Sequence, residues 1–265
     1  MVAEALERSR LAVVEQIAQV GQLWRLAVAA VVQTATGPFR GERFRLRQTV
    51  DQVLRAGNAS LPLVALIAAL VGMILALQSA YQLRQLGAQN LVADLVAVSV
   101  TRELGPLMTA ILVAGRVGSA ISAELGTMKV SEEIDALTVM GIDPTSYLVV
   151  PRLIGLLVAV PCLTLFADAI GILSGCAIGV FVLDQSPIGY LDDSIAILEL
   201  QDLWGGVLKA FAFGGIIGLV GCQQGLGTEG GAEGVGRSTT TAVVRSIVLI
   251  IVADLLVTAL LYLQK

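Results

Sequence analysis

Five long apolar segments, separated by shorter polar stretches, set the pattern of the chain. A membrane-spanning α-helix needs about 20 mostly apolar residues, and each segment approaches or exceeds that length. Helical spans are therefore expected at about 61–81, 95–124, 153–183, 204–222 and 241–263. The pattern predicts an all-α integral membrane protein whose membrane domain covers residues 59–265.

The region before the first span, residues 1–58, has a different pattern. Apolar residues such as Val13, Ile17 and Trp24 recur at helical spacing through residues 1–36, which predicts an amphipathic helix. Residues 37–58 carry five arginines interleaved with aromatic and aliphatic side chains. Such a segment suits either an anionic membrane surface or a solvated helical arm, and the interleaving favours the membrane surface.

Basic residues near the ends of the spans predict the orientation in the membrane. The five arginines precede the first span, and Lys129 and Arg152 flank the loop after the second. The loop between the third and fourth spans has five acidic residues and no Lys or Arg. The N-terminus is therefore expected on the cytoplasmic side of the membrane, and the C-terminus on the outer side.

The composition agrees with a membrane protein and makes several kinds of chemistry improbable. Hydrophobic residues make up 56% of the chain and charged residues 14%, against about 45–50% and 25% in soluble domains. There is no histidine, and Cys162, Cys176 and Cys222 lie inside apolar runs. No catalytic residue, metal site or cofactor is expected. The net charge of -4 gives no reason to expect a nucleic-acid partner.

Ionisable side chains occur inside several spans, where they are costly and usually face a cavity or the interior of a helix bundle. Arg102, Arg116 and Glu124 fall on one stripe of the second span, with Glu103 beside it. These residues either line a functional cavity or form ion pairs that fix helix packing. Single charges in the later spans are Asp168, Lys209 and Asp254.

Glycines and prolines mark sites of close packing and of irregular helix. Gly171, Gly175 and Gly179 follow one another at four-residue spacing in the third span. This spacing lets helices approach closely, either between two subunits or within one. Pro106 is expected to kink the second span, and Pro161 is a place where the third can break.

The polar segment 131–144, between the second and third spans, predicts a short amphipathic helix. Its acidic residues suit a helix N-terminus, and Gly141 and Pro144 suit the end. The segment is either a helix that docks on a partner protein or an ordinary surface helix. The candidate docking residues are Glu132, Glu133, Ile134, Asp135, Leu137 and Met140.

Two blocks of the sequence carry a family resemblance. They are RELGPLMTAILVAGRVGSAISAELGTMKVSEEIDALTVMGIDPTSYLVVPR (102–152) and GTEGGAEGVGRSTTTAVVRSIVLIIVADLLVTALL (227–261). Both closely resemble the MlaE/YrbE permease family, the membrane subunits of MCE-associated ABC transporters. The resemblance covers roughly residues 45–263.

The resemblance implies a homodimer of five-span subunits, each with an N-terminal interfacial helix. It implies cytoplasmic ABC ATPase subunits, a periplasmic MCE-domain protein and phospholipid as cargo, in a cell inner membrane or a plastid inner envelope. By this resemblance, Arg102, Glu103 and Lys209 lie in a lipid cavity between two subunits, and residues 131–143 form the helix that couples to the ATPase.

Two other functions remain possible on the residues alone. One is an ion-coupled secondary transporter that uses Glu103 or Asp168 as a proton site. The other is a membrane-embedded enzyme, although no nucleophile–base set is recognisable. The chain also lacks the GK[ST] signature of a P-loop, so any ATP hydrolysis is expected in a partner subunit.

Overall fold

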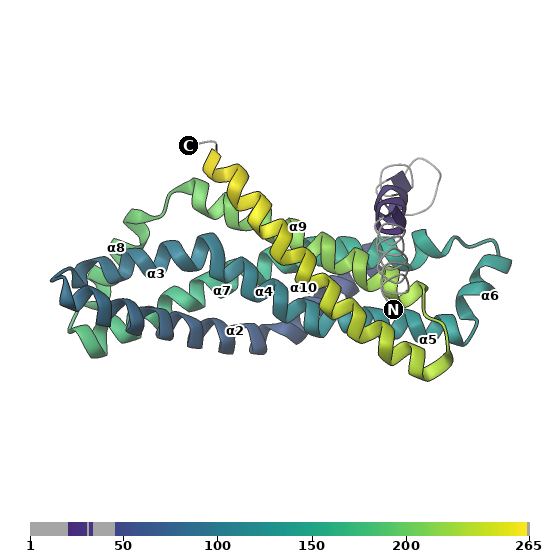
Figure 1. The fold of residues 1–265 in the computed structure, drawn as a ribbon, viewed down its shortest axis with the longest axis horizontal. Coiled ribbons are helices and arrows are strands. Elements are labelled where there is room, and N and C mark those ends of the chain that lie inside the picture. The colour runs from purple at the N-terminus through teal and green to yellow at the C-terminus, as the bar shows by residue number, and fades with distance from the viewer. Residues whose placement is uncertain (1–20, 31, 34–45, 264–265) are drawn as a thin grey trace, which may run out of the picture.

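The computed structural model describes residues 21–30, 32–33 and 46–263, and these ranges contain helices and no strand. Among the described residues, five helical segments are long and apolar enough to cross a membrane, and they run together along the long axis of the molecule (Figure 1). This arrangement confirms the all-α membrane fold. The five segments are Arg47–Gln85, Gln89–Val130, Thr145–Leu183, Leu200–Leu226 and Gly231–Leu261.

Three of the five segments are continuous helices, and the second and third contain tighter or wider turns. The first, fourth and fifth segments are α2 (Leu46–Gln85), α9 (Leu200–Leu226) and α10 (Gly231–Leu263). The second consists of a 3-10 turn η2 (Gln89–Leu91), α3 (Val92–Ser99), a π-helical turn η3 (Val100–Leu104), α4 (Gly105–Val113), a second π-helical turn η4 (Ala114–Gly118) and α5 (Ser119–Val130). The third joins the π-helical turn η5 (Thr145–Val149) to α7 (Val150–Leu183).

The break expected at Pro161 is wrong, and the kink expected at Pro106 stays a prediction. The third segment does not break at Pro161, because α7 continues through it. Of the irregular turns in the second segment, the π-helical turn η3 is the nearest to Pro106 and ends two residues before it. Neighbouring helices and local adjustments of the ladder satisfy the backbone groups that a proline frees within a membrane bundle, so a proline need not end a span.

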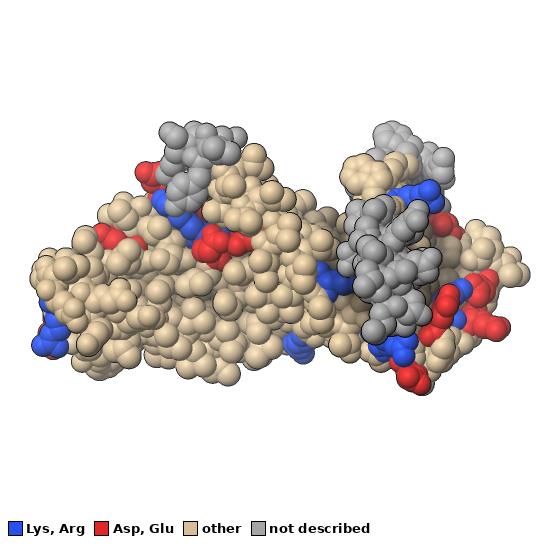
Figure 2. All heavy atoms as spheres, viewed as in Figure 1, with Lys and Arg blue, Asp and Glu red and all other residues tan. Residues whose placement is uncertain are grey.

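On the face shown in Figure 2, charged side chains are few across the middle of the molecule and gather mainly in its left third and at its right end. Large aliphatic residues point outward from the outermost helices, including Leu66 and Ile74 of α2 and Leu255 of α10, which are 58%, 61% and 69% exposed. Apolar surface on this scale would be unfavourable in water. It fits a bundle surrounded by the hydrocarbon of a bilayer.

The two ends of the bundle carry different short helices (Figure 1). One end carries α6 (Glu133–Val139) and the helical residues 21–30, which run across the bundle axis. The other end carries α8 (Pro187–Ile197). Leu26 packs against the main core, while Trp24 and Val28 face outward. The remainder of the expected amphipathic helix, residues 1–20 and 34–36, lies outside the described residues.

Candidate functional site

A cavity of about 550 Å³ opens between the second, fourth and fifth membrane segments, with one side chain of the first segment also in its wall. Its walls include the apolar side chains of Leu75, Val98, Leu104 and Leu261. Its polar lining is concentrated on η3 and on the first turns of α9, and comprises Ser99, Arg102, Glu103, Gln201, Asp202, Lys209 and Thr258. The cavity is therefore amphiphilic, with ionised groups beside apolar walls.

The π-helical turn η3 brings Arg102 and Glu103 to this cavity. It lies against α9 at a point where α9 has a glycine: a β-carbon on Gly206 would lie 2.6 Å from the carbonyl oxygen of Thr101. Only a residue without a side chain allows the two backbones to approach this closely. Lys209, about one turn further along α9, is thereby placed directly over η3.

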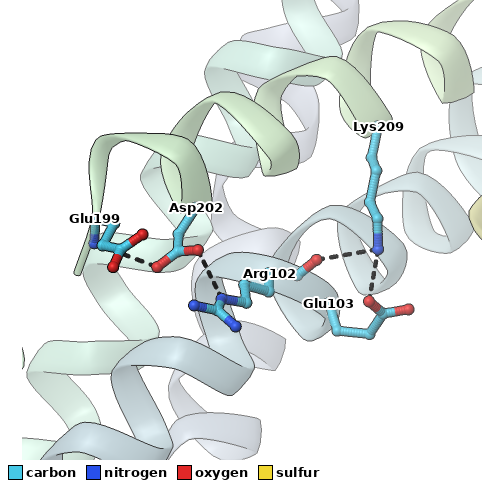
Figure 3. A network of polar contacts seen from close by, with 5 residues as sticks. All are labelled: Arg102, Glu103, Glu199, Asp202 and Lys209. Carbon is cyan, nitrogen blue, oxygen red and sulfur yellow. Dashed lines mark hydrogen bonds and ion pairs between the residues drawn. The ribbon is translucent and has the colours of Figure 1, made fainter. Parts of the chain in front are cut away.

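Lys209 is the centre of a polar network and is only 2% exposed. Its Nζ donates to Oε2 of Glu103 and to the carbonyl oxygen of Arg102, the latter at 3.1 Å (Figure 3). Nζ also forms an ion pair of 2.9 Å with Oδ1 of Asp254 on α10. An ammonium has three donors, and three acceptors surround this one. Lys209 therefore ties the second, fourth and fifth segments together.

Arg102 is held by a different acid. Its Nε lies 2.7 Å from Oδ1 of Asp202, whose side chain is 6% exposed (Figure 3). Asp202 also accepts the backbone N–H of Glu199 in a capping box that begins α9. The Arg102 and Glu103 side chains are 37% and 41% exposed. Of the five ionised groups, these two are the accessible ones.

The structure brings the three predicted cavity residues together and adds two that were not predicted. Asp202 falls in the acidic loop that the sequence predicts, but in the structure it lies on α9, two helical turns before Lys209 on the same face. Asp254, a single charge of the last span, does not line the cavity and joins the network through its ion pair with Lys209. The sequence does contain a signal for the pairing of Asp254 with Lys209. An acid inside a span needs a cation, and Lys209 is one of few candidates.

The remaining members of the predicted charge stripe lie elsewhere. Glu124 pairs with the buried Arg152 at the start of α7, with 3.0 Å between Oε2 and Nη2. Arg116 lies on η4 with an exposed side chain. Glu124 therefore has a local structural partner, and the stripe does not form one continuous site.

The predicted docking segment contains α6, but its apolar residues divide in an unexpected way. Ile134 is buried and Leu137 partly buried against the core of the chain itself. Val139 and Met140 are 89% and 64% exposed at the end of the helix. Glu132 and Glu133 are exposed, and Asp135 forms an ion pair of 3.0 Å with Lys129. The large apolar side chains that a partner can reach on this segment are therefore Val139 and Met140, beside exposed acidic side chains.

The three glycines of the third span make their contacts within the subunit. A β-carbon on Gly171 would lie 3.1 Å from Cγ1 of Val100, and one on Gly175 would lie 2.8 Å from the hydroxyl of Tyr190. Gly179 faces the ring of Tyr190, 2.6 Å from its Cδ2. These glycines thus let α7 pack against η3 and α8 of the same chain.

A bundle of five membrane segments with an amphiphilic, ion-lined cavity has the architecture of a membrane transport subunit. Residues 49–260 match the family described as Permease MlaE, and the chain belongs to this family. Among its relatives is a probable ABC transporter permease protein of Rickettsia typhi, 44% identical over 211 residues that cover 80% of this chain and 82% of the relative.

Two further relatives come from photosynthetic organisms. A probable ABC transporter permease protein of Synechocystis is 38% identical, covering 83% of this chain and 84% of the relative. The chloroplastic protein TRIGALACTOSYLDIACYLGLYCEROL 1 of Arabidopsis thaliana is also 38% identical, covering 88% of this chain and 67% of the relative. The chain is thus an ABC transporter permease subunit and not itself an enzyme. ATPase partner subunits are implied, and an ion-coupled secondary carrier is set aside.

Proposed function

We propose that this permease moves phospholipid between membranes through the cavity beside Arg102 and Glu103. The observation that carries the proposal is the lining of the cavity. A phospholipid has a charged headgroup and apolar chains, and the cavity offers ionised side chains beside Leu75, Val98 and Leu261. The name of the Arabidopsis relative contains that of a glycerolipid, which is in keeping with lipid as cargo.

Within this proposal Arg102 and Lys209 have different roles. A guanidinium binds a phosphate with two parallel hydrogen bonds, and the Arg102 side chain is accessible from the cavity while Asp202 orients it. Lys209 is buried and already has three acceptors. Lys209 therefore acts by holding Glu103 and η3 in place, and Arg102 is the group that binds phosphate.

Two substitutions at Arg102 test the cavity. Arg102→Lys keeps the positive charge and loses the two-pronged geometry, so the purified protein should retain about tenfold less phospholipid with an almost unchanged melting temperature. Arg102→Ala should retain still less. Arg237→Lys is the matched control, because Arg237 is 81% exposed and remote from the cavity. A stable Arg102→Ala protein with normal phospholipid content would remove Arg102 from the site.

The assembly that we propose is a homodimer of this chain with two ABC ATPase subunits and a periplasmic MCE-domain protein. The permease domain comprises residues 59–265, and residues 1–58 form an N-terminal region at the cytoplasmic membrane surface. The protein lies in a cell inner membrane with a cytoplasmic N-terminus, as the distribution of arginines favours. The helical residues 21–30 and α6 share one end of the bundle, which this orientation makes cytoplasmic.

The ATPase is proposed to dock on α6 through Val139 and Met140. Aspartate at both positions places unpaired charge in an apolar contact, which is strongly unfavourable. Copurification of the ATPase should be lost while the melting temperature of the permease stays unchanged, because neither side chain is buried in the subunit. Ile195→Asp is the control, since Ile195 is 70% exposed on α8 at the opposite end. Intact assembly in the α6 variant would place the docking surface elsewhere.

A further inference from the structure

Asp168 of α7 is a buried carboxyl that the cavity does not use. Its side chain is 6% exposed, and among the described residues Oδ1 has no hydrogen-bond partner and the carboxyl forms no ion pair. The acids of the cavity network differ, because Glu103, Asp202 and Asp254 each pair with Lys209 or Arg102. A polar group in this setting is costly, so its position calls for a specific contact.

That contact is with the backbone immediately after η3. A β-carbon on Gly105 would overlap Oδ1 of Asp168 and lie 2.9 Å from its Cγ. The carboxyl therefore rests directly on the Gly105 backbone. About one turn further along α7, Gly171 lies against Val100, the first residue of η3. The helix α7 thus contacts both ends of the turn that carries Arg102 and Glu103.

The opposite side of η3 is held by α9. Gly206 packs on the Thr101 carbonyl, and Lys209 donates to the Arg102 carbonyl at 3.1 Å. The turn therefore lies between a support on α7 and a polar clamp on α9. A displacement of η3 on the α7 side would shift the carbonyl that Lys209 binds and, with it, the side chains in the cavity.

We propose that Asp168 is a positioning residue, which seats the π-helical turn so that Arg102 and Glu103 face the cargo. This role rests on the proposed function of the cavity. Asp168 acts through its shape and its polar atoms rather than through its charge, because no cation among the described residues balances a charge there. Asparagine has the same shape and a polar amide, whereas leucine fills a similar space without polar atoms.

The experiment compares Asp168→Asn, Asp168→Leu and the control Thr164→Val. Thr164 is a fully buried α7 residue one turn earlier, and its hydroxyl also lacks a partner. Bound phospholipid should stay within about twofold of the wild type in Asp168→Asn and Thr164→Val. It should fall about tenfold in Asp168→Leu, as expected when binding groups are displaced by about 1 Å. Equal retention in all three variants would overturn the proposal.

A purely structural role is separated by repeating Asp168→Leu in a Glu103→Gln background. If Asp168 acts by placing Glu103 and its neighbours, the two losses should not multiply, because both act on one site. Multiplying losses would show a general effect on folding and overturn the positioning role. If Glu103→Gln and Arg102→Ala both retain normal phospholipid, the cavity proposal itself fails. If they lose phospholipid and Asp168→Leu does not, only the role of Asp168 fails.

A second pair of variants decides the matter if Asp168→Leu does not fold. Gly105→Ala introduces a β-carbon where Oδ1 of Asp168 lies, so it should displace η3 and lower bound phospholipid. Combining it with Asp168→Ala makes room for that β-carbon and should recover at least about half of the loss. A double variant no better than Gly105→Ala alone would show that the two residues do not act through their contact.

Discussion

The second membrane segment contains two π-helical turns that look alike in sequence and differ in surroundings. Both η3 and η4 have five residues with an arginine in the third position, Arg102 and Arg116. The first is packed on both sides, with Gly206 of α9 and Gly171 of α7 against its backbone and side chains. The second is open on one side only: a β-carbon on Gly115 would meet no atom within 4 Å and Arg116 is exposed, whereas Gly118 is buried against Ile217 of α9.

The difference shows that the neighbours of a π-helical turn decide what the turn does. Such turns often occur at functional sites because they redirect side chains. At η3 the redirected arginine finds Asp202 inside the same subunit. At η4 the described residues supply no ion pair for Arg116. An arginine in a membrane segment is costly without a partner, so in the homodimer proposed above the exposed side of η4 is a candidate contact with the second copy.

The largest loss of stability is expected from Lys209→Met, which removes the cation that binds the backbone of η3. The buried Asp254 would then lie without a positive charge beside the partly exposed Glu103, and breaking a buried ion pair costs about 3–5 kcal/mol. Thermal unfolding in detergent should show a fall in melting temperature of many degrees. Lys129→Met is the matched control, because the Lys129–Asp135 pair is exposed on both sides and is worth about 0–1 kcal/mol.

A compensating variant makes this prediction specific. Adding Glu103→Gln and Asp254→Asn to Lys209→Met removes the unpaired charges and should recover most of the lost stability, since a neutral replacement of a buried ionic cluster is often well tolerated. If Lys209→Met were as stable as Lys129→Met, the network around η3 would not be the support that the geometry describes.

The helices could be predicted from the sequence, and the partners of the charges could not. Apolar length alone places the five spans, because any span must bury its backbone in helix. The grouping of Arg102, Glu103 and Lys209 was predicted through the family resemblance. The pairing of Arg102 with Asp202 depends on the register between the second and fourth segments, which the approach of Gly206 sets. No local pattern encodes that register.

Sequence periodicity also could not predict which apolar residues of α6 are exposed. Helical spacing predicts that Ile134, Leu137 and Met140 share an apolar edge, but it does not say which edge faces the bundle. In the structure Ile134 and Leu137 pack on the core, and this packing leaves Met140 and Val139 outside. Periodicity identifies an amphipathic helix; tertiary packing decides which of its residues remain accessible to a partner.

A smaller effect, on the affinity between the two copies, is expected from Arg116→Ala in η4. If a second copy covers η4, the substitution removes a group from the interface and should weaken the dimer by roughly tenfold or more, seen as a shift toward monomer on dilution in detergent. The melting temperature of the monomer should hardly change, because Arg116 has no intrasubunit ion pair among the described residues. Arg237→Ala, at an 81% exposed position, is the control. An unchanged dimer fraction would place η4 outside the interface.

The smallest effect is expected from Ser119→Ala, which alters η4 without altering its surroundings. The hydroxyl of Ser119 donates to the carbonyl oxygens of Gly115 and Arg116 at 2.6 and 2.9 Å. These are local bonds back along the same helix, and such bonds add little to helix stability. The change in unfolding free energy should stay within about 0.5 kcal/mol, measured beside Lys209→Met in the same thermal assay. A loss comparable to that of Lys209→Met would mean that η4 depends on its own hydroxyl for its shape. Local hydrogen bonds would then account for the shape of η4, and no contact with a second copy would be needed to explain it.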